Sequence, residues 1–236
     1  ERPKARICLE AMDALISHLN ERGAKEALIT PPPAVYYRHY EASAEMAIQA
    51  IGGILAERQV TSILDLREFR LAGLDHCEGR CRTAYRKALK SRLVINRKPS
   101  IEDFYSILID NKARRGALPT HSLEEFKTIQ KRFPSELVIT TAELDGKPIG
   151  GIAYFRANRT CCLLFYVCHL TDHDRYNSPT LLIMDALEQE EKEGLRYFDF
   201  GTTCTKSNMR EKLSLFSFKE SFGTYGVFRD TYRITI

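Results

Sequence analysis

The sequence lacks several features that would assign it to a special class of protein. No apolar run approaches the ~20 residues that a membrane-spanning helix needs, and no secretory signal pattern is visible. Sustained heptads, strict short repeats and low-complexity segments are also missing. With 44% hydrophobic and 28% charged residues, the chain is not largely disordered, and its 236 residues suit two small domains. Because it begins with Glu1 rather than Met, we expect the natural protein to start earlier.

The cysteines follow neither a disulfide nor a zinc pattern. There are seven, an odd number at irregular spacing: Cys8, Cys77, Cys81, Cys161, Cys162, Cys168 and Cys204. Cys77 and Cys81 lack a second Cys/His pair at zinc spacing, so we expect no metal. We expect free thiols in a reducing, cytoplasmic location, with Cys161, Cys162 and Cys168 as small buried apolar residues. The net charge of +4 permits an anionic ligand or RNA without requiring one.

The first part of the chain predicts alternating helices and strands. The spacing of apolar residues predicts a helix over 7–22 and another over 41–51. Residues 26–30 and 62–66 have the composition of strands, and three prolines end the first of them. The segment 76–91 is helical in its second half. It carries most of the densest basic run, which comprises Arg80, Arg82, Arg86, Lys87, Lys90 and Arg92.

The second part predicts two helices, three antiparallel strands, a helix, a strand, a helix and a strand. The helices are expected over 100–116, 121–133 and 178–194, and the three strands over 136–144, 147–157 and 160–170. Ser122 with Glu125 forms a capping box, and Ser178 is expected as an N-cap before Pro179. Asp145-Gly146 is a strong hairpin signal. We therefore expect two domains, over 1–97 and 98–236.

This order and four segments resemble the GNAT acyltransferase fold and its FemABX-type branch. The segments read "PTHSLEEFKTIQKRFP", "ELDGKPIGGIAYF", "DRYNSPTLLIMDALEQEEKEGLRYFDFG" and "LSLFSFKESFGT", and they cover most of 100–236. Residues 7–37 resemble the later half of the first GNAT-like domain of that branch. The resemblance implies an α/β fold with a mixed sheet, a complete C-terminal GNAT-like domain and a partial N-terminal one.

The sequence departs from the family pattern at two places, and the second bears on the donor substrate. Ser214 stands where the family usually has glycine, and the turn before residue 178 has no glycine-rich loop. In this fold, backbone N–H groups at a helix N-terminus bind the acyl-CoA pyrophosphate, and glycines allow close approach. Arg175 remains available to pair with a phosphate. The missing loop fits the FemABX branch, whose members use aminoacyl-tRNA or other activated donors.

Acyl transfer to an amine needs positioned substrates, a proton acceptor and a group that stabilises the developing oxyanion. The resemblance implies a role for Phe218 and Lys219 near the transferred carbonyl, with Lys219 as the cation. The alternative is a lysine that snorkels from an amphipathic helix or pairs with an acidic neighbour. Asp199 closes a strand, where it either orients substrate or caps the following turn.

The loop after the strand at 160–170 offers further polar candidates. His173 or Asp174 is a candidate general base, since an unperturbed histidine titrates near pH 6.5. The alternative is a solvated polar loop. Tyr166 is a candidate substrate contact, although its place at the strand centre favours core packing. Arg86 and the rest of the basic run either bind a tRNA or form a solvated helix face.

These observations predict a transferase that moves an acyl or aminoacyl group onto an amine of a cell-envelope or sugar-linked acceptor. It would use acyl-CoA or aminoacyl-tRNA as a donor co-substrate, with no permanently bound cofactor, no metal, no DNA partner and no covalent enzyme intermediate. Two alternatives stay open. One is an acyl-CoA-dependent N-acyltransferase in polysaccharide or small-molecule modification, and the other is a non-catalytic binding module. The sequence does not indicate an oligomeric state.

Overall fold

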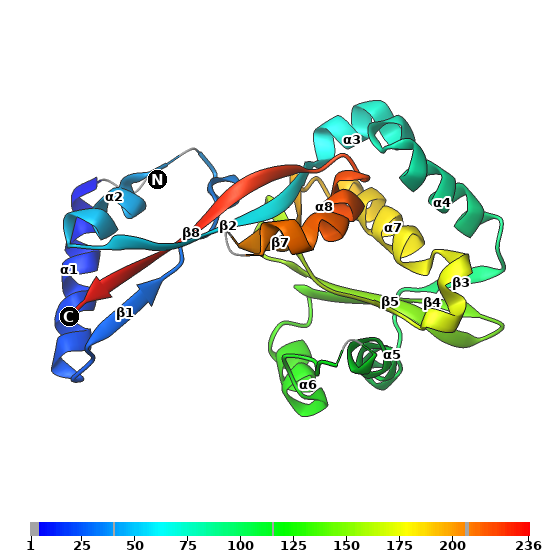
Figure 1. The fold of residues 1–236 in the computed structure, drawn as a ribbon, viewed down its shortest axis with the longest axis horizontal. Helices are drawn as coiled ribbons and strands as arrows, with labels where there is room; N and C mark the ends of the chain where they lie inside the picture. Colours follow the sequence, from blue (N-terminus) through cyan, green and yellow to red (C-terminus); the bar gives the residue numbers. More distant parts are fainter. Residues whose placement is uncertain (1–4, 40, 115, 206–207) are drawn as a thin grey trace. The chain divides into compact units, whose positions relative to one another are not determined.

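The computed structural model describes residues 5–39, 41–114, 116–205 and 208–236 (Figure 1). The chain divides into two compact units, each discontinuous in sequence. Unit 1 comprises residues 1–62, 202–216 and 226–236, and unit 2 comprises residues 63–201 and 217–225. The boundary expected near residue 97 falls inside unit 2, so the assignment of domains 1–97 and 98–236 stays a prediction.

The strands form a mixed sheet in the order β1-β8-β2-β7-β6-β5-β4-β3. In unit 2, the antiparallel pairs β3–β4, β4–β5 and β5–β6 are followed by the parallel pair β6–β7. The bounds of these strands are β3 (Leu93–Asn96), β4 (Leu137–Leu144), β5 (Lys147–Arg156), β6 (Cys161–His169) and β7 (Tyr197–Thr205). The predicted hairpin turn is confirmed, because Asp145 and Gly146 both have positive φ, as a tight turn between β4 and β5 requires.

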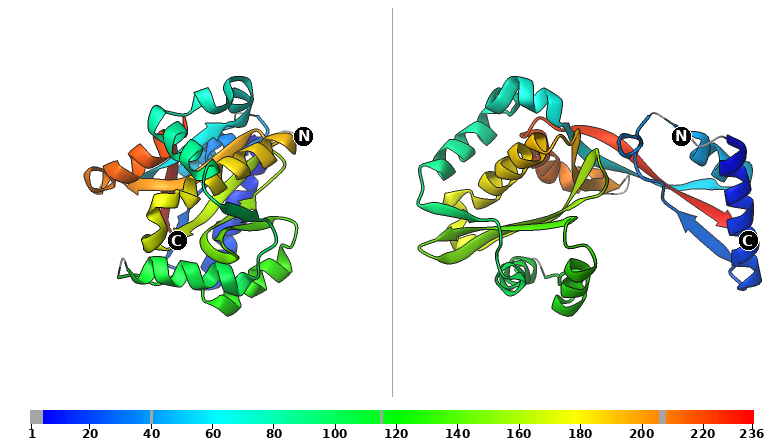
Figure 2. Two further views of the ribbon diagram at one scale, coloured as in Figure 1. Left: turned by 90° about the vertical axis from the view of Figure 1, so that its right-hand side faces the viewer. Right: turned by 180° about the vertical axis from the view of Figure 1, so that it is seen from behind.

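Helices cover both faces of the unit 2 strands, as Figure 2 shows from behind. On one face, α5 (Ile101–Ala113) and α6 (Leu123–Arg132) enclose a core that includes Phe104 and Phe126. On the other, α7 (Ser178–Lys192) packs on the sheet and is itself covered by α3 (Leu66–Ala72) and α4 (Gly79–Leu89). This double contact explains why every residue from Thr180 to Leu187 of α7 is buried. Unit 2 also contains the short helices η2 (Gly73–His76) and η3 (Thr171–Tyr176) and the C-terminal half of α8 (Leu213–Glu220), whereas η4 (Met209–Lys212) and the start of α8 belong to unit 1.

Helix capping agrees with the sequence at two positions and differs at a third. Ser100 accepts a hydrogen bond from the Asp103 N–H, and Ser122 with Glu125 forms the expected capping box. The prediction that Ser178 caps α7 is wrong, because the N-cap is Asn177, which has φ +54. Ser178 instead lies against Gly150, where a Cβ would come within 2.3 Å of the Ser178 Oγ. Close packing of helix on strand therefore overrides the local capping preference.

Unit 1 is smaller and has a thinner core. It contains α1 (Ala5–Glu21), β1 (Glu26–Ile29), η1 (Ala34–Tyr36), α2 (Ser43–Ala50), most of β2 (Ile54–Asp65) and most of β8 (Tyr225–Thr235). β1 pairs antiparallel with β8, and Ile48, Tyr232 and Ile234 form the buried centre. The strand expected at 62–66 is the buried end of the longer β2. None of the helices among the described residues is long and apolar enough to cross a membrane.

Asp65 in unit 2 provides a test of the electrostatics at the start of α3. It is the N-cap of α3, and its carboxylate accepts hydrogen bonds from the backbone and side chain of Arg67. Burial opposes its charge, but these bonds and the charges of Arg67 and Arg196 outweigh burial and lower the pKa of Asp65. A carboxyl whose pKa is lowered by folding stabilises the fold above its unfolded-state pKa of about 4. That contribution is lost as the pH falls through the folded-state value.

We therefore expect Asp65→Asn to lower the free energy of unfolding near neutral pH, and the loss to shrink as the pH falls below about 4. Asparagine also caps helices well, so the substitution removes the charge and keeps the cap. Urea unfolding of both proteins across this pH range measures the difference. A difference that stays constant with pH would show that the charge contributes nothing.

Candidate functional site

The neighbouring strands β6 and β7 of unit 2 both depart from regular β-strand geometry just after the residues that pair them with each other. Residues Cys161–Leu163 of β6 pair in parallel with Tyr197–Asp199 of β7. Beyond this point β7 reaches Gly201, whose φ of +75° is not that of an extended strand. On β6 the register with β5 shifts next to Leu164, so that Phe165 is an extra residue. Such β-bulges are over-represented beside active sites because they redirect side chains and interrupt the ladder.

The side chains of Lys219 and Asp199 both form hydrogen bonds with the backbone of Gly201. The Asp199 Oδ1 accepts a hydrogen bond from the Gly201 N–H at 2.7 Å, and the Lys219 Nζ donates to the Gly201 carbonyl at 2.7 Å. Both side chains are buried, with 3% and 6% exposure. The structure thus brings these two predicted residues together. Lys219 does not snorkel to solvent, and the Asp199 contact is the turn cap that the sequence offered as an alternative.

The C-terminal turn of α8, which carries Lys219, is held by the segment that opens α4. The Glu78 N–H donates to the Ser221 carbonyl at 2.8 Å, and His76 lies 3.1 Å from the Gly223 carbonyl. Arg80 donates to the Ser217 Oγ at 3.0 Å. Half-buried Phe218 packs against the core and meets the Phe222 ring edge-on at 5.3 Å. These contacts fix the position of Lys219 within unit 2.

The predicted polar residues after β6 lie on and beside η3. The Asp174 Oδ1 lies 2.7 Å from the His169 Nε2. The His173 ring stacks on Tyr176, and its Nδ1 is buried without a hydrogen-bond partner among the described residues. Exposed Arg175 also lies over the Tyr176 ring, 4.9 Å from its centre. The side chains of this segment therefore contact one another, and Asp174 and Arg175 are exposed.

Tyr166 belongs to the core on the α5–α6 side. It is 7% exposed, its ring meets Phe126 edge-on, and its hydroxyl lies 3.3 Å from the His121 Nδ1. No pattern in the sequence indicated a role for His121, which precedes the capping box. Nor did it mark Asn111, whose side chain donates to the His169 carbonyl at 2.9 Å. Both contacts join residues that are far apart in the chain, so no local sequence pattern predicts them.

Three residues of the basic run lie beside acidic side chains. Arg80, Arg82 and Arg92 lie near the carboxylates of Glu78, Asp75 and Asp145, respectively. Arg86, Lys87 and Lys90 are exposed on α4. Because residues three and four apart share a helix face, Arg86, Lys87 and Lys90 present their charges to one side of α4.

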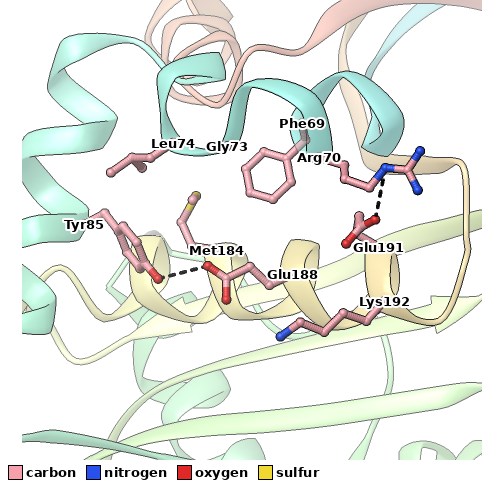
Figure 3. Close-up of a pocket in the computed structure, with 9 residues that line it drawn as sticks. All are labelled: Phe69, Arg70, Gly73, Leu74, Tyr85, Met184, Glu188, Glu191 and Lys192. Atoms are coloured by element: carbon pink, nitrogen blue, oxygen red, sulfur yellow. Dashed lines mark hydrogen bonds and ion pairs between the residues drawn. The ribbon is translucent and has the colours of Figure 1, made fainter.

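A pocket of about 230 Å³ lies between α7 and the layer formed by α3, η2 and α4 (Figure 3). Its apolar wall includes Phe69, and four of its polar residues form two pairs. The Tyr85 hydroxyl donates to Glu188, and Arg70 pairs with Glu191. Burial, followed by the charge of Glu188, raises the pKa of Tyr85 to about 12. None of the predicted site residues lines this pocket, so it is distinct from the Lys219 site.

The cysteines are free thiols, as predicted, and six of the seven are buried. Burial raises the pKa of the Cys162 and Cys168 thiols, which makes them poor nucleophiles. Among the residues that the structure describes, no group of three or more His, Cys, Asp or Glu side chains is arranged to hold a metal ion.

We expect Gly201→Ala to destabilise the protein by about 1–2 kcal/mol, because L-residues are strained at positive φ. The added Cβ would also lie 3.3 Å from the Leu164 carbonyl oxygen. Gly194→Ala is a matched control, since Gly194 also has positive φ but nothing within 4 Å of its Cβ position. Urea unfolding compares the two variants. Equal losses would show that the contact with Leu164 is not restrictive.

Solved structures with the same fold are known, although no curated protein sequence matches the chain. The crystal structure of FemX has a TM-score of 0.78 at 14% identity, covering 97% of this chain and 77% of that one. The C-terminal domain (DUF2156) of a putative lysylphosphatidylglycerol synthetase from Agrobacterium fabrum has a TM-score of 0.70 at 11% identity, covering 95% and 72%. L-PGS from Bacillus licheniformis has a TM-score of 0.68 at 11% identity, covering 94% and 71%. At these identities the likeness is one of fold.

The sequence profile of the Acetyltransferase (GNAT) domain matches residues 77–212, which is more than half of the chain. The matched segment runs from α4 to η4 and contains the β6 bulge, Asp199 and Gly201. It confirms the predicted GNAT-like α/β fold and indicates a transferase; the expected truncation of the N-terminal half stays a prediction. The chain belongs to the Acetyltransferase (GNAT) domain family.

Proposed function

We propose that the protein is a FemABX-like transferase that moves an acyl or aminoacyl group onto an amine of a cell-envelope or sugar-linked acceptor. The observation that carries this proposal is the buried Lys219 ammonium, held against the Gly201 carbonyl where β7 leaves β6. A lysine buried in this way is an oriented positive charge in a low-dielectric setting. Such a charge stabilises an oxyanion more strongly than a solvated lysine does.

In the proposed reaction, the amine nitrogen attacks the carbonyl carbon of the activated ester or thioester. The C–N bond forms, the carbonyl oxygen becomes an oxyanion, and the bond to the donor oxygen or sulfur then breaks. Lys219 stabilises the oxyanion, and Asp199 fixes the Gly201 turn that holds Lys219. Phe218 forms an apolar contact to the transferred group. Tyr166 supports the β6 bulge from the core side rather than contacting substrate through its hydroxyl, which is engaged by His121.

The attacking amine must also lose a proton. We assign this role to His173, whose Nδ1 has no hydrogen-bond partner among the described residues and whose ring is held by stacking on Tyr176. Asp174 is less suited because its carboxylate binds His169. On this assignment Asp174 orders the end of β6 against η3, and His173 is the group that accepts the proton.

The N-terminus of α7 favours aminoacyl-tRNA over acyl-CoA as the donor. Asp172 and Asp174 place two exposed carboxylates in the turn before it, where a pyrophosphate would be repelled. Pro179 removes one N–H from the first helical turn. The exposed cations Arg86, Lys87 and Lys90 on α4 are suited to the phosphates of a tRNA.

Equilibrium binding of aminoacyl-tRNA and of acetyl-CoA tests this choice of donor. We expect aminoacyl-tRNA to bind, and the joint substitution of Arg86, Lys87 and Lys90 by glutamine to weaken it at least tenfold and flatten its salt dependence. Glutamine at exposed Lys131, Arg132 and Lys147 is the charge-matched control. Tight binding of acetyl-CoA without binding of the tRNA would exclude the proposed donor.

A second candidate function is acyl-CoA-dependent N-acyltransfer in polysaccharide or small-molecule modification. One observation favours it. The Ser178 Oγ at the N-terminus of α7 is buried without a hydrogen-bond partner among the described residues. Arg175 lies in the turn before it, where it is suited to a phosphate. Binding of both donors without turnover would instead favour a non-catalytic binding module.

A further inference from the structure

Unit 1 contains a pocket of its own, of about 300 Å³, that the proposed reaction does not use. It lies between the loop after β1, the first turn of α2 and strand β8, whose positions Figure 1 labels. Three successive prolines, Pro31–Pro33, form one wall, and Phe228 and Tyr232 contribute aromatic rings. Because proline has a fixed φ, little conformational entropy is lost when a ligand packs on this wall.

Two carboxylates line the pocket, and only one of them is neutralised. Asp230 receives two hydrogen bonds of 2.7 Å from Arg58, whose guanidinium also lies over the Phe228 ring at 4.3 Å. Glu45 has no such partner. Its Oε2 is buried and accepts no hydrogen bond among the residues that the structure describes. The pocket therefore combines apolar and aromatic walls with one carboxylate that no described residue neutralises.

We infer that this pocket binds a primary ammonium group carried on an aliphatic stem, as in a lysine side chain. The ammonium would donate to the Glu45 carboxylate, and the methylene stem would pack on Pro31–Pro33 and Phe228. An anion would be repelled by Glu45, and a neutral apolar molecule would leave the buried Oε2 without a donor.

A purely structural role for Glu45 is the alternative to binding a ligand. It lies in the first turn of α2, whose N-cap, Ala42, makes no side-chain cap bond, so the carboxylate stabilises the helix N-terminus. That role explains a negative charge at this position. It does not explain why the charge adjoins a proline and aromatic pocket, or why one oxygen lacks a donor.

The pocket in Figure 3 provides the contrast that singles out the unit 1 site. There Glu188 accepts a hydrogen bond from the Tyr85 hydroxyl and Glu191 pairs with Arg70, so each carboxylate has a partner of its own. Both pockets have apolar walls, and only the unit 1 pocket has a carboxylate oxygen that is buried without a donor.

The test is equilibrium binding to the whole chain, followed by NMR chemical shifts, with Nα-acetyl-lysine amide as the probe. Its Nε-acetylated form has the same stem without the charge and is the matched ligand control. We expect the charged probe to bind with a Kd on the order of millimolar and the acetylated form to bind at least tenfold more weakly. Glu45→Gln should weaken the charged probe by at least tenfold, and Phe228→Leu by about threefold.

Glu57→Gln is the control variant, since it removes the same charge from an exposed position on β2 outside the pocket. If Glu45→Gln fails to fold, Glu45→Asp replaces it as the test variant. Glu45→Asp keeps the charge, but its shorter side chain should also weaken binding of the charged probe. The inference is overturned if the acetylated probe binds as well as the charged one. It is also overturned if Glu45→Gln, or Glu45→Asp in its place, binds like wild type, or if wild type binds neither probe. Because the readout is binding in unit 1, failure here leaves the proposed transfer reaction untouched.

Discussion

Replacing Lys219 by methionine is expected to lower kcat/KM for the transfer reaction about 10²–10³-fold, the range seen when one oxyanion-stabilising donor is removed. Methionine keeps the length and apolar stem of the side chain and removes only the ammonium. The substitution therefore tests the charge that lies 2.7 Å from the Gly201 carbonyl. Steady-state kinetics measures the effect once a donor and an acceptor have been identified.

Two control variants separate a catalytic role from a structural one. Lys219→Arg keeps the positive charge and should retain more activity than Lys219→Met. Lys212→Met removes an exposed lysine of η4 and should leave kcat/KM within about twofold of wild type. If Lys219→Met lowers the melting temperature while the folded enzyme keeps full kcat/KM, the lysine only supports the Gly201 turn.

Glu190→Leu should lower the free energy of unfolding by about 3 kcal/mol, the largest effect on stability that we expect from a single site. Glu190 is completely buried and accepts two hydrogen bonds from Arg156, at 2.8 and 2.9 Å, and one from the Tyr154 hydroxyl at 2.8 Å. Leucine would leave both donors without their partner inside the core. Part of the cost is relieved because the Arg156 side chain is 36% exposed.

Glu191→Leu is the matched control on the same helix. Its partner Arg70 lies 3.6 Å away and is 64% exposed, so the pair is worth at most about 1 kcal/mol. Urea unfolding of the two variants and wild type compares the losses. If Glu190→Leu and Glu191→Leu lose the same amount, the buried network does not stabilise the fold in the way argued above.

The sequence predicted the elements whose signals are local. The antiparallel strands β4, β5 and β6 followed from three consecutive strand-like segments and the Asp145-Gly146 turn, and the capping box of α6 followed from Ser122 and Glu125. Residues Ile54 and Leu55 of β2 were not predicted as strand because that end of β2 is exposed on both faces. An exposed strand has no alternating pattern, since neither face is required to be apolar.

The candidate site was only partly predictable for a related reason. Lys219 and Phe218 were selected by family resemblance, and no spacing in the sequence marked them. The hydrogen bond of Lys219 to Gly201 depends on a positive φ that one glycine adopts beside a bulge in another strand. The left-handed Asn177 before α7 likewise depends on how closely Ser178 packs on Gly150. Such geometry arises from contacts between distant segments.

The most direct test of the proposed function is mass spectrometry of the transfer product. Purified protein is incubated with a mixture of aminoacyl-tRNAs or with acetyl-CoA, together with amine-bearing cell-envelope precursors. We predict a new amide on an acceptor amine, formed from aminoacyl-tRNA by wild type and nearly abolished in Lys219→Met. Formation of the amide from acetyl-CoA alone, or equal amounts from wild type and Lys219→Met, would contradict the account.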